Sequence, residues 1–464
     1  MSDRPAPSGL EEVAAVTPPV ASPKPRTVRT ALRMNVRGRS VRLRGLRRPP
    51  TGIWRWLVIL GPGLIASSAG NDAGGIATYS STGAKYGYEL IWVMLLMTVS
   101  LCVVQEMCAR LGAATGRGLL DLIRERFGVG WAVFAVGIIL VANGGLIVSE
   151  FVGIGAAVEL LGFSKLIVIP AAAALIFYLV VFGNYGRVEK IFLLMTLVFF
   201  AYPIAAIMAH PSWGLVAHGA FVPTLHKDPD YIFLLVGLMG TTITPYMQIF
   251  QQSSTVERGG DRRCYGPERA DAYVGAIFSN LMSIFMIVAT AATLHAVGKT
   301  NIETAADAAR ALQPVAGHFA GTIFAIGLLG ASLLAAAVLP LATSYAVSEA
   351  FGFSKGVGLD FRRARPFFTL FTLLMVFGAT AALIPGIPVI KLLLWIQVLN
   401  GILLPVILVF LLLLSNDSRL TKNLKNTHFY NVLGWGTFGI ITLAVTIMLL
   451  TQIFGLFGIN LFGG

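Results

Sequence analysis

The chain has 464 residues and a formal net charge of +13, with 56% hydrophobic and only 12% charged residues. A soluble domain carries about 25% charged residues, so this composition excludes a soluble globular protein and indicates a membrane protein with many spans. The cysteines Cys102, Cys108 and Cys264 lack the spacing of metal ligands, which argues against a zinc or redox centre.

Residues 1–55 are expected to form a disordered, basic cytoplasmic tail. A Pro/Ala/Ser-rich stretch is followed by nine arginines between Arg26 and Arg48, and the segment has no apolar core of a signal peptide. Such a run favours contact with anionic lipid at the membrane surface over binding of nucleic acid.

Hydropathy predicts about eleven segments of the ~20 residues that a bilayer requires. They cover residues 56–83, 88–112, 131–160, 165–183, 188–209, 231–256, 272–298, 316–351, 366–385, 388–414 and 429–457. Lysine and arginine concentrate in the loops after the even-numbered spans. The positive-inside rule therefore predicts a cytoplasmic N-terminus and an outside C-terminus in the plasma membrane, the inner membrane of a bacterium.

Asp72 is a lone carboxylate within the first span, and Gly70, Gly74 and Gly75 around it weaken a helix. A charge at bilayer depth costs about 3 kcal/mol and marks a functional site by default. The pattern predicts a discontinuous helix that offers one carboxylate and freed carbonyls to a cation. The alternative is that Asp72 only caps the second half-helix.

The sixth span contains a second interruption, at Pro245. Proline removes a backbone donor and frees the carbonyls near Thr241 and Thr244, although an ordinary proline kink is the alternative. The two interruptions lie five spans apart. This offset predicts two inverted five-helix repeats (56–210 and 231–414) plus an eleventh helix (429–457), with substrate at the midplane between the breaks.

The polar atoms at the two breaks are oxygens. This ligand set suits magnesium, calcium, manganese or sodium, and makes copper and zinc poor candidates. Two further polar residues have open roles. Glu150 lines an aqueous path or is a buried, hydrogen-bonded acid, and Gln397 contributes to the cation site or bonds between helices.

The chain resembles the Nramp (natural resistance-associated macrophage protein) family of divalent-metal transporters from about residue 56 to 457. The resemblance is carried by Gly61-Pro62-Gly63, Ala109-Arg110-Leu111-Gly112, Thr115-Gly116, Gln397-Val398, Leu404-Pro405 and Leu414-Ser415-Asn416-Asp417. It implies an all-α polytopic protein of the LeuT-type fold, with helices 1 and 6 broken and a metal site between them.

Asp72 aligns with the aspartate of the family's DPGN motif, and Glu150 with a retained glutamate. Five other positions differ: the Asn ligand is Gly75, the Met ligand is Thr244, the His linked to proton coupling is Tyr246, a second His is Gln251, and an acid of the proton route is Ile147. Losing the thioether removes discrimination against magnesium, and losing the histidines and the acid removes most groups that could carry a proton.

These differences resemble the Nramp-related magnesium transporters, a branch thought to carry hydrated magnesium, and manganese, without proton coupling. The expected metal site comprises the Asp72 carboxylate, a Thr241 carbonyl and the Thr244 hydroxyl, with Gly75 and Gln397 shaping the cavity. The alternatives are a proton-coupled manganese or iron transporter and a sodium-coupled carrier of an organic solute. The chain has no nucleotide motif, so we expect no enzyme and no cofactor, with the metal as substrate.

Overall fold

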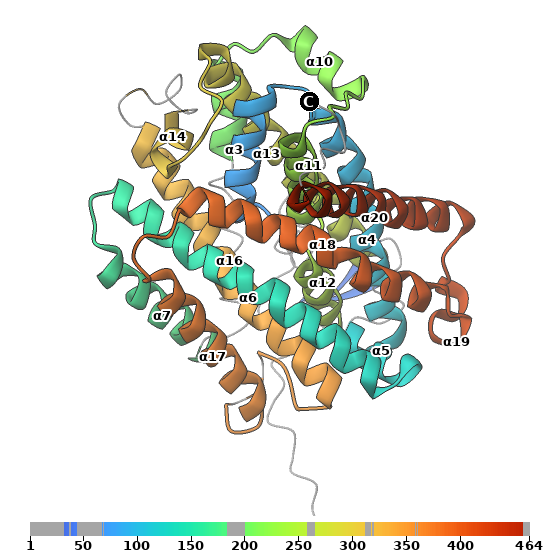
Figure 1. The fold of residues 1–464 in the computed structure, drawn as a ribbon. Helices are drawn as coiled ribbons and strands as arrows, with labels where there is room; N and C mark the ends of the chain where they lie inside the picture. Colours follow the sequence, from blue (N-terminus) through green and yellow to red (C-terminus); the bar gives the residue numbers. More distant parts are fainter. Residues whose placement is uncertain are drawn as a thin grey trace, which may run out of the picture.

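The computed structural model describes residues 32–36, 39–43, 67, 69–182, 200–257, 265–310, 317, 320–357, 359 and 361–457. Helices dominate (Figure 1). The exception is an antiparallel pair of strands, β1 (Leu32–Val36) and β2 (Arg39–Leu43). We expected disorder throughout residues 1–55, so this hairpin differs from the expectation. Apolar residues alternate along both strands, a period-two pattern that the arginine content concealed. The rest of the tail lies outside the described residues.

Nine helices in these ranges are long and apolar enough to cross a membrane, and they correspond to expected spans 2–4 and 6–11. They are α4 (Ile91–Thr115), α6 (Val129–Leu160), α7 (Lys165–Phe182), α11 (Pro229–Thr242) with α12 (Pro245–Glu257), α13 (Tyr265–Thr293), α16 (Ala320–Phe351), α17 (Arg365–Ala382), α18 (Val389–Asn416) and α20 (His428–Leu456). Span 5 is represented by α9 (Ala201–Met208), and residues 183–199 lie outside the described residues.

The first span is broken where the glycines predicted it. Residues 69–72 form a turn, and α3 (Ala73–Tyr86) begins immediately afterwards. Ser67 before the turn is helical, and residues 56–66 of the expected span lie outside the described residues. Helix α3 therefore corresponds to only the second half of the expected first span.

The sixth span is broken as well. Ile243 ends α11 with an extended backbone, and Pro245 opens α12. Proline suits the first position of a helix because its missing N–H would have no partner there. The sixth span thus consists of two separate helices and is not a single helix with a proline kink.

The short helices outside the expected spans lie at the two ends of the bundle. They are α5 (Leu119–Phe127), α10 (Trp213–Phe221), α14 (Ala305–Ala309) and α19 (Ser418–Thr421). Figure 1 shows α10 at the top, and α5 and α19 near each other at the lower right. α5 is amphipathic, with Leu119, Leu120, Leu122 and Ile123 buried.

The broken helices are held by close backbone packing. α11 contacts α18, which also contacts α3. A Cβ at Gly240 would meet the Gln397 carbonyl oxygen and lie 2.9 Å from the Gly401 Cα, so only glycine fits at this crossing. α6 and α16 pack against each other on another side, where a Cβ at Gly153 would lie 2.6 Å from the Ser332 Oγ.

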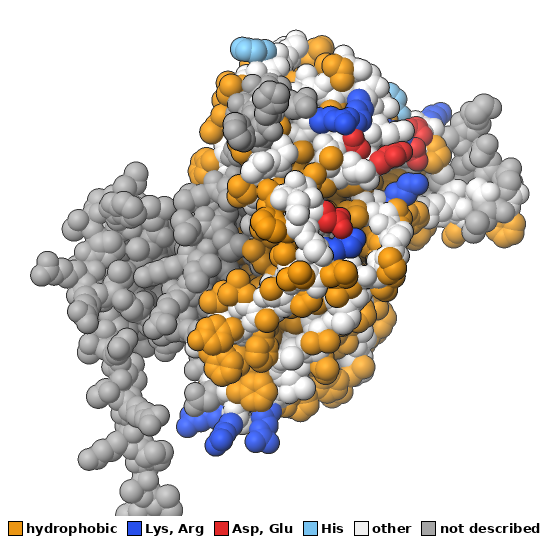
Figure 2. Space-filling model, turned by 90° about the vertical axis from the view of Figure 1, so that its left-hand side faces the viewer, with side chains coloured by type: hydrophobic (Ala, Val, Ile, Leu, Met, Phe, Trp, Pro, Cys, Tyr) orange, Lys and Arg blue, Asp and Glu red, His pale blue; other side chains and the backbone are white. Residues whose placement is uncertain are grey.

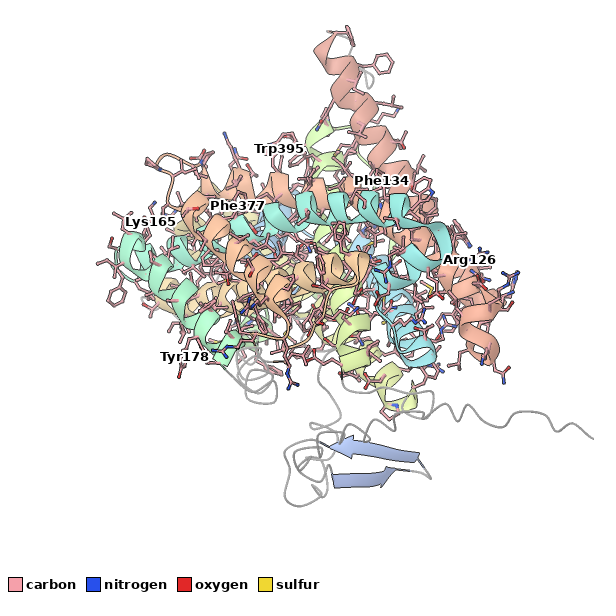
Figure 3. The ribbon with its side chains drawn as sticks, turned by 90° about the horizontal axis from the view of Figure 1, so that it is seen from below. Arg126, Phe134, Lys165, Tyr178, Phe377 and Trp395 are labelled. Carbon is pink, nitrogen blue, oxygen red and sulfur yellow. The ribbon has the colours of Figure 1, made fainter. Side chains whose placement is uncertain are left out.

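The outer surface fits a lipid environment. Figure 2 shows hydrophobic side chains over much of the described surface, with Lys and Arg along its lower edge. Figure 3 shows Phe134, Tyr178, Phe377 and Trp395 on peripheral helices, and all four are exposed. The chain is therefore an integral membrane protein whose apolar helices face the lipid.

We predict that Gly240→Ala destabilises the protein by about 1–3 kcal/mol, the usual effect of overpacking, because the atoms in its way belong to the α18 backbone. Thermal unfolding in detergent measures this effect. Gly439→Ala in α20 is the matched control, because a Cβ there has no described neighbour within 4 Å. Equal melting temperatures for the two variants would contradict the packing role of Gly240.

Candidate functional site

Asp72 is the N-cap of α3, as the alternative interpretation proposed. Its Oδ1 accepts a hydrogen bond from the Gly75 N–H at 2.5 Å and another from Gln397 Nε2 at 3.0 Å. Its Oδ2 is buried and has no hydrogen-bond partner among the described residues. Capping thus occupies one oxygen and leaves the second free to bind a ligand.

A second carboxylate meets the same helix end. Glu150 of α6 accepts a hydrogen bond from the Ala73 N–H at its Oε2 (3.2 Å) and one from the Ser149 hydroxyl at its Oε1 (3.0 Å). The N-terminus of a helix attracts negative charge because its first N–H groups lack helical partners. Glu150 is therefore a buried, hydrogen-bonded acid at the same helix end as Asp72, and its role in an aqueous path stays a prediction.

Gly75 brings the two breaks together. A Cβ at this position would lie 2.8 Å from the Gly70 carbonyl oxygen, 3.0 Å from the Thr241 Oγ1 and 3.2 Å from the Asp72 Oδ1. Three oxygens from both broken spans therefore converge on the space that a side chain would fill. Thr241 directs its hydroxyl toward this space, whereas we had expected only its carbonyl to take part.

The remaining candidate ligands are buried with free polar atoms. The hydroxyls of Thr241 and Thr244 and the Gln397 Oε1 have no partner within the part of the chain that the structure describes. All three residues are fully buried, as is Asp72. Leaving a buried polar atom unpaired costs about 1–3 kcal/mol, so a group of them at one place indicates a binding site.

Gln397 approaches Asp72 because Gly74 leaves room for it. A Cβ at Gly74 would collide with the Gln397 side-chain amide. Its Nε2 binds Asp72 while its Oε1 stays free. Gln397 thus makes an interhelical hydrogen bond and also offers an oxygen to the site.

The residues expected along the ion path separate into two groups. On α12, Tyr246 and Gln251 are fully buried, and neither the Tyr246 hydroxyl nor the Gln251 amide has a partner in the described residues. Gln248, one turn after Thr244, has the same environment. Ile147 lies elsewhere, because it packs against Gly378 of α17.

Side chains of α13 hold the unwound turn in place, a contact that the sequence pattern did not predict. Asn71 Nδ2 donates to the Ser279 carbonyl at 3.1 Å, and its Oδ1 accepts from the Ser283 hydroxyl at 2.7 Å. The Ser279 hydroxyl also donates to the Ser67 carbonyl at 2.5 Å. Ser279 and Ser283 lie four residues apart on one face of α13, and this spacing was the available signal.

Another buried acid links α16 to α12 and α5. Glu349 of α16 accepts hydrogen bonds from the Ser253 hydroxyl of α12 at 2.7 Å and from the Leu120 N–H of α5 at 3.2 Å. Gln252 Nε2 donates to the Arg117 carbonyl at 2.9 Å. At the opposite end of the bundle, Lys85 in the last turn of α3 forms an ion pair with Asp230 of α11.

This arrangement combines one free carboxylate oxygen with neutral oxygens. The described residues contain no group of three or more His, Cys, Asp or Glu that could hold a metal ion. A permanent, highly charged metal centre is thus not built here. One carboxylate oxygen together with neutral oxygens is a donor set that suits hard cations.

The chain matches the family model "Natural resistance-associated macrophage protein-like" over residues 63–451. It is 29% identical over 388 residues to the divalent metal cation transporter MntH of Klebsiella pneumoniae (strain 342), covering 82% of this chain and 90% of the relative. It is 31% identical over 295 residues to the MntH of Yersinia pestis (strain Pestoides F), covering 62% and 71%.

Solved structures show the same fold. A manganese transporter of Eremococcus coleocola aligns with a TM-score of 0.68 at 20% identity, over 89% of this chain and 90% of that one. MhsT in complex with L-phenylalanine aligns with a TM-score of 0.57 at 15% identity, over 84% and 98%. The expected LeuT-type fold is therefore confirmed.

We predict that Asp72→Asn separates capping from cation binding. Asparagine caps helices as well as aspartate does, so the variant should keep the melting temperature while its affinity for Mg²⁺ and Mn²⁺ falls by more than about 100-fold. Loss of an outer-shell partner alone costs about 10–100-fold. Calorimetric titration measures this.

The matched control is Asp228→Asn, since Asp228 caps α11 at its outer end. It should bind metal like the wild type. Full affinity in Asp72→Asn would show that Asp72 serves only as a cap.

Proposed function

Because this chain belongs to the Nramp family of divalent-metal transporters, we propose that it imports partly hydrated magnesium, and manganese, by uncoupled alternating access. As a family member it is a divalent metal cation transporter and not an enzyme, and the metal is its substrate. The observation that carries the finer proposal is that the Asp72 Oδ2 at one helix break and the hydroxyls of Thr241 and Thr244 at the other are buried without partners among the described residues.

The ligand chemistry supports magnesium. Hydroxyl, carbonyl and carboxylate oxygens suit hard cations, whereas a thioether at position 244 would favour softer ones. Magnesium loses its water reluctantly and is usually held by one or two carboxylates plus several waters. A single free carboxylate oxygen, with the oxygens of Gly70 and Thr241 converging above Gly75, supports this requirement.

The groups along α12 support passage of a hydrated ion. Gln248 and Gln251 lie three residues apart on one face of α12, and Thr244 directly precedes this helix. The two amides offer donors and acceptors without charge. Such a surface can bind the water shell of an ion without replacing it.

The absence of proton carriers supports uncoupled transport. Tyr246, Gln251 and Ile147 occupy positions where the family pattern has titratable groups, and none of them changes charge near neutral pH. No described histidine lies in α3, α11 or α12. Glu150 is the remaining acid, and it is engaged by the Ala73 N–H and the Ser149 hydroxyl.

The membrane potential would then drive import. With the N-terminus in the cytoplasm, as the positive-inside rule indicates, the interior-negative potential supplies about 2.3 kcal/mol per charge per 100 mV. A divalent ion gains roughly twice that. Release into the cytoplasm requires α12 to part from Glu349 and α5, while the outer contacts stay closed.

A proton-coupled manganese or iron transporter is the second candidate function. Glu150 favours it, since this acid lies at the same helix end as Asp72 and could pass a proton when the ion binds. The MhsT alignment supports the fold alone, so a sodium-coupled carrier of an organic solute has no comparable observation in its favour.

We predict that proteoliposomes take up Mg²⁺ and Mn²⁺ without acidifying their lumen, because no proton carrier accompanies the ion. A metal-sensitive dye and a pH dye inside the same vesicles measure both quantities. Asp72→Ala is the inactive control. Lumen acidification in proportion to metal uptake would instead support the proton-coupled candidate.

We predict that Thr244→Met shifts selectivity toward softer metals. A thioether favours Mn²⁺ and Cd²⁺ over Mg²⁺, so the ratio of Cd²⁺ to Mg²⁺ uptake should rise at least about tenfold, equivalent to 1.4 kcal/mol. Thr244→Leu has similar bulk without sulfur and is the control. An equal shift in both variants would mean that size, and not the sulfur, determines selectivity.

A further inference from the structure

A cavity of about 350 Å³ opens at the end of the bundle where α5 meets the junction of α18 and α19. It lies within the range of about 300–1,000 Å³ that is typical of ligand pockets. Its polar lining comprises Arg126, Asn416, Asp417, Ser418 and Arg419. It is separate from the Asp72 site, because α5 and α19 lie at the end of the bundle and not at the helix breaks.

The one acid in the lining is already engaged. Asp417 Oδ2 accepts a hydrogen bond from Arg126 Nε at 2.7 Å, and its Oδ1 accepts one from the Arg419 N–H at 2.8 Å. These hydrogen bonds hold the pKa of Asp417 below its usual range. Two guanidinium groups against one carboxylate leave the cavity with a net positive charge. The side chain of Arg126 is still 51% exposed.

An apolar wall adjoins this basic cavity. Leu413 lines the cavity and is exposed. Trp131 and Phe134 of α6 are 55% and 49% exposed, and Trp131 and Phe127 both pack edge-on against Phe410, at 5.9 and 5.4 Å between ring centroids. Figure 3 shows Arg126 and Phe134 toward the same end of α6. Exposed tryptophan beside arginine is typical of the membrane–water interface.

We propose that this cavity binds the phosphate headgroup of an anionic phospholipid from the cytoplasmic leaflet, with the acyl chains along Trp131, Phe134 and Leu413. Basic pockets between helices on the cytoplasmic side are suited to such headgroups, and arginine binds phosphate through paired N–H groups. The inference uses the orientation given under the proposed function but does not depend on which metal is carried.

The alternative is a purely structural ion pair that ties α5 to α19. In that case neither arginine would affect lipid binding. The two interpretations also differ in what they expect of Trp131 and Phe134. Lipid binding requires these exposed aromatic residues, whereas an ion pair does not.

Native mass spectrometry of the full-length protein, with phosphatidylglycerol titrated against a phosphatidylcholine background, tests the proposal. Each of Arg126→Gln and Arg419→Gln should weaken phosphatidylglycerol retention about fivefold, and the double variant roughly 25-fold, from about 1 kcal/mol per basic residue. The charge-matched control is Arg362→Gln with Arg363→Gln, two exposed arginines between α16 and α17, which should retain lipid like the wild type.

Equal retention in the double variant and the control would overturn the site. If the double variant does not fold, Arg419→Gln decides alone, because it leaves the ion pair between Arg126 and Asp417 intact. Inorganic phosphate tests the source of the ligand. If millimolar phosphate displaces the lipid completely, or if Trp131→Ala with Phe134→Ala leaves retention unchanged, the cavity is a soluble-anion site and the lipid proposal fails. Neither readout requires transport, so both stand apart from the metal proposal.

Discussion

The first turn of α3 begins inside the protein, and the hydrogen bond from the Gly75 N–H to Asp72 fixes where it begins. The rest of the site depends on this contact. It holds one carboxylate oxygen in place and leaves the other free, while the absence of a side chain on Gly75 and Gly74 admits Thr241 and Gln397. A helix that continued through this point would satisfy its own backbone and offer no ligand. Local chain breakage therefore creates the site.

The surrounding helices stabilise a break that would be unfavourable alone. The Asn71 side chain forms hydrogen bonds with α13. Glu150 of α6 accepts a hydrogen bond from the Ala73 N–H, which has no partner within its own helix. The Ala73 N–H and the Ser67 carbonyl thus gain partners from neighbouring helices, as irregular backbone at membrane depth requires. The candidate ligand atoms differ from these groups, because they are buried and have no hydrogen-bond partner among the described residues.

Much of this arrangement could be predicted from the sequence, because a charge, a glycine cluster or a proline within an apolar span is tolerated only in a few structural situations. Asp72 and Pro245 marked both breaks correctly. The double role of Asp72 as cap and candidate ligand was not accessible, since it depends on which oxygen faces Gly75. The position of Ile147 against Gly378, the contacts of Asn71 with α13 and the hairpin at residues 32–43 depend on tertiary contacts or register. Hydropathy does not report these.

The complete burial of Asp72 has a kinetic consequence. Because no atom of this residue reaches solvent, an ion bound there as proposed could not leave by simple dissociation. Under the proposed function, its dwell time would depend on how often α12 separates from Glu349 and α5, and not on the strength of its ligands. Weak coordination is then compatible with retention of the ion, and the maximal flux becomes a property of helix motion. Substitutions in the closing contacts, far from the ligands, would govern the rate of turnover.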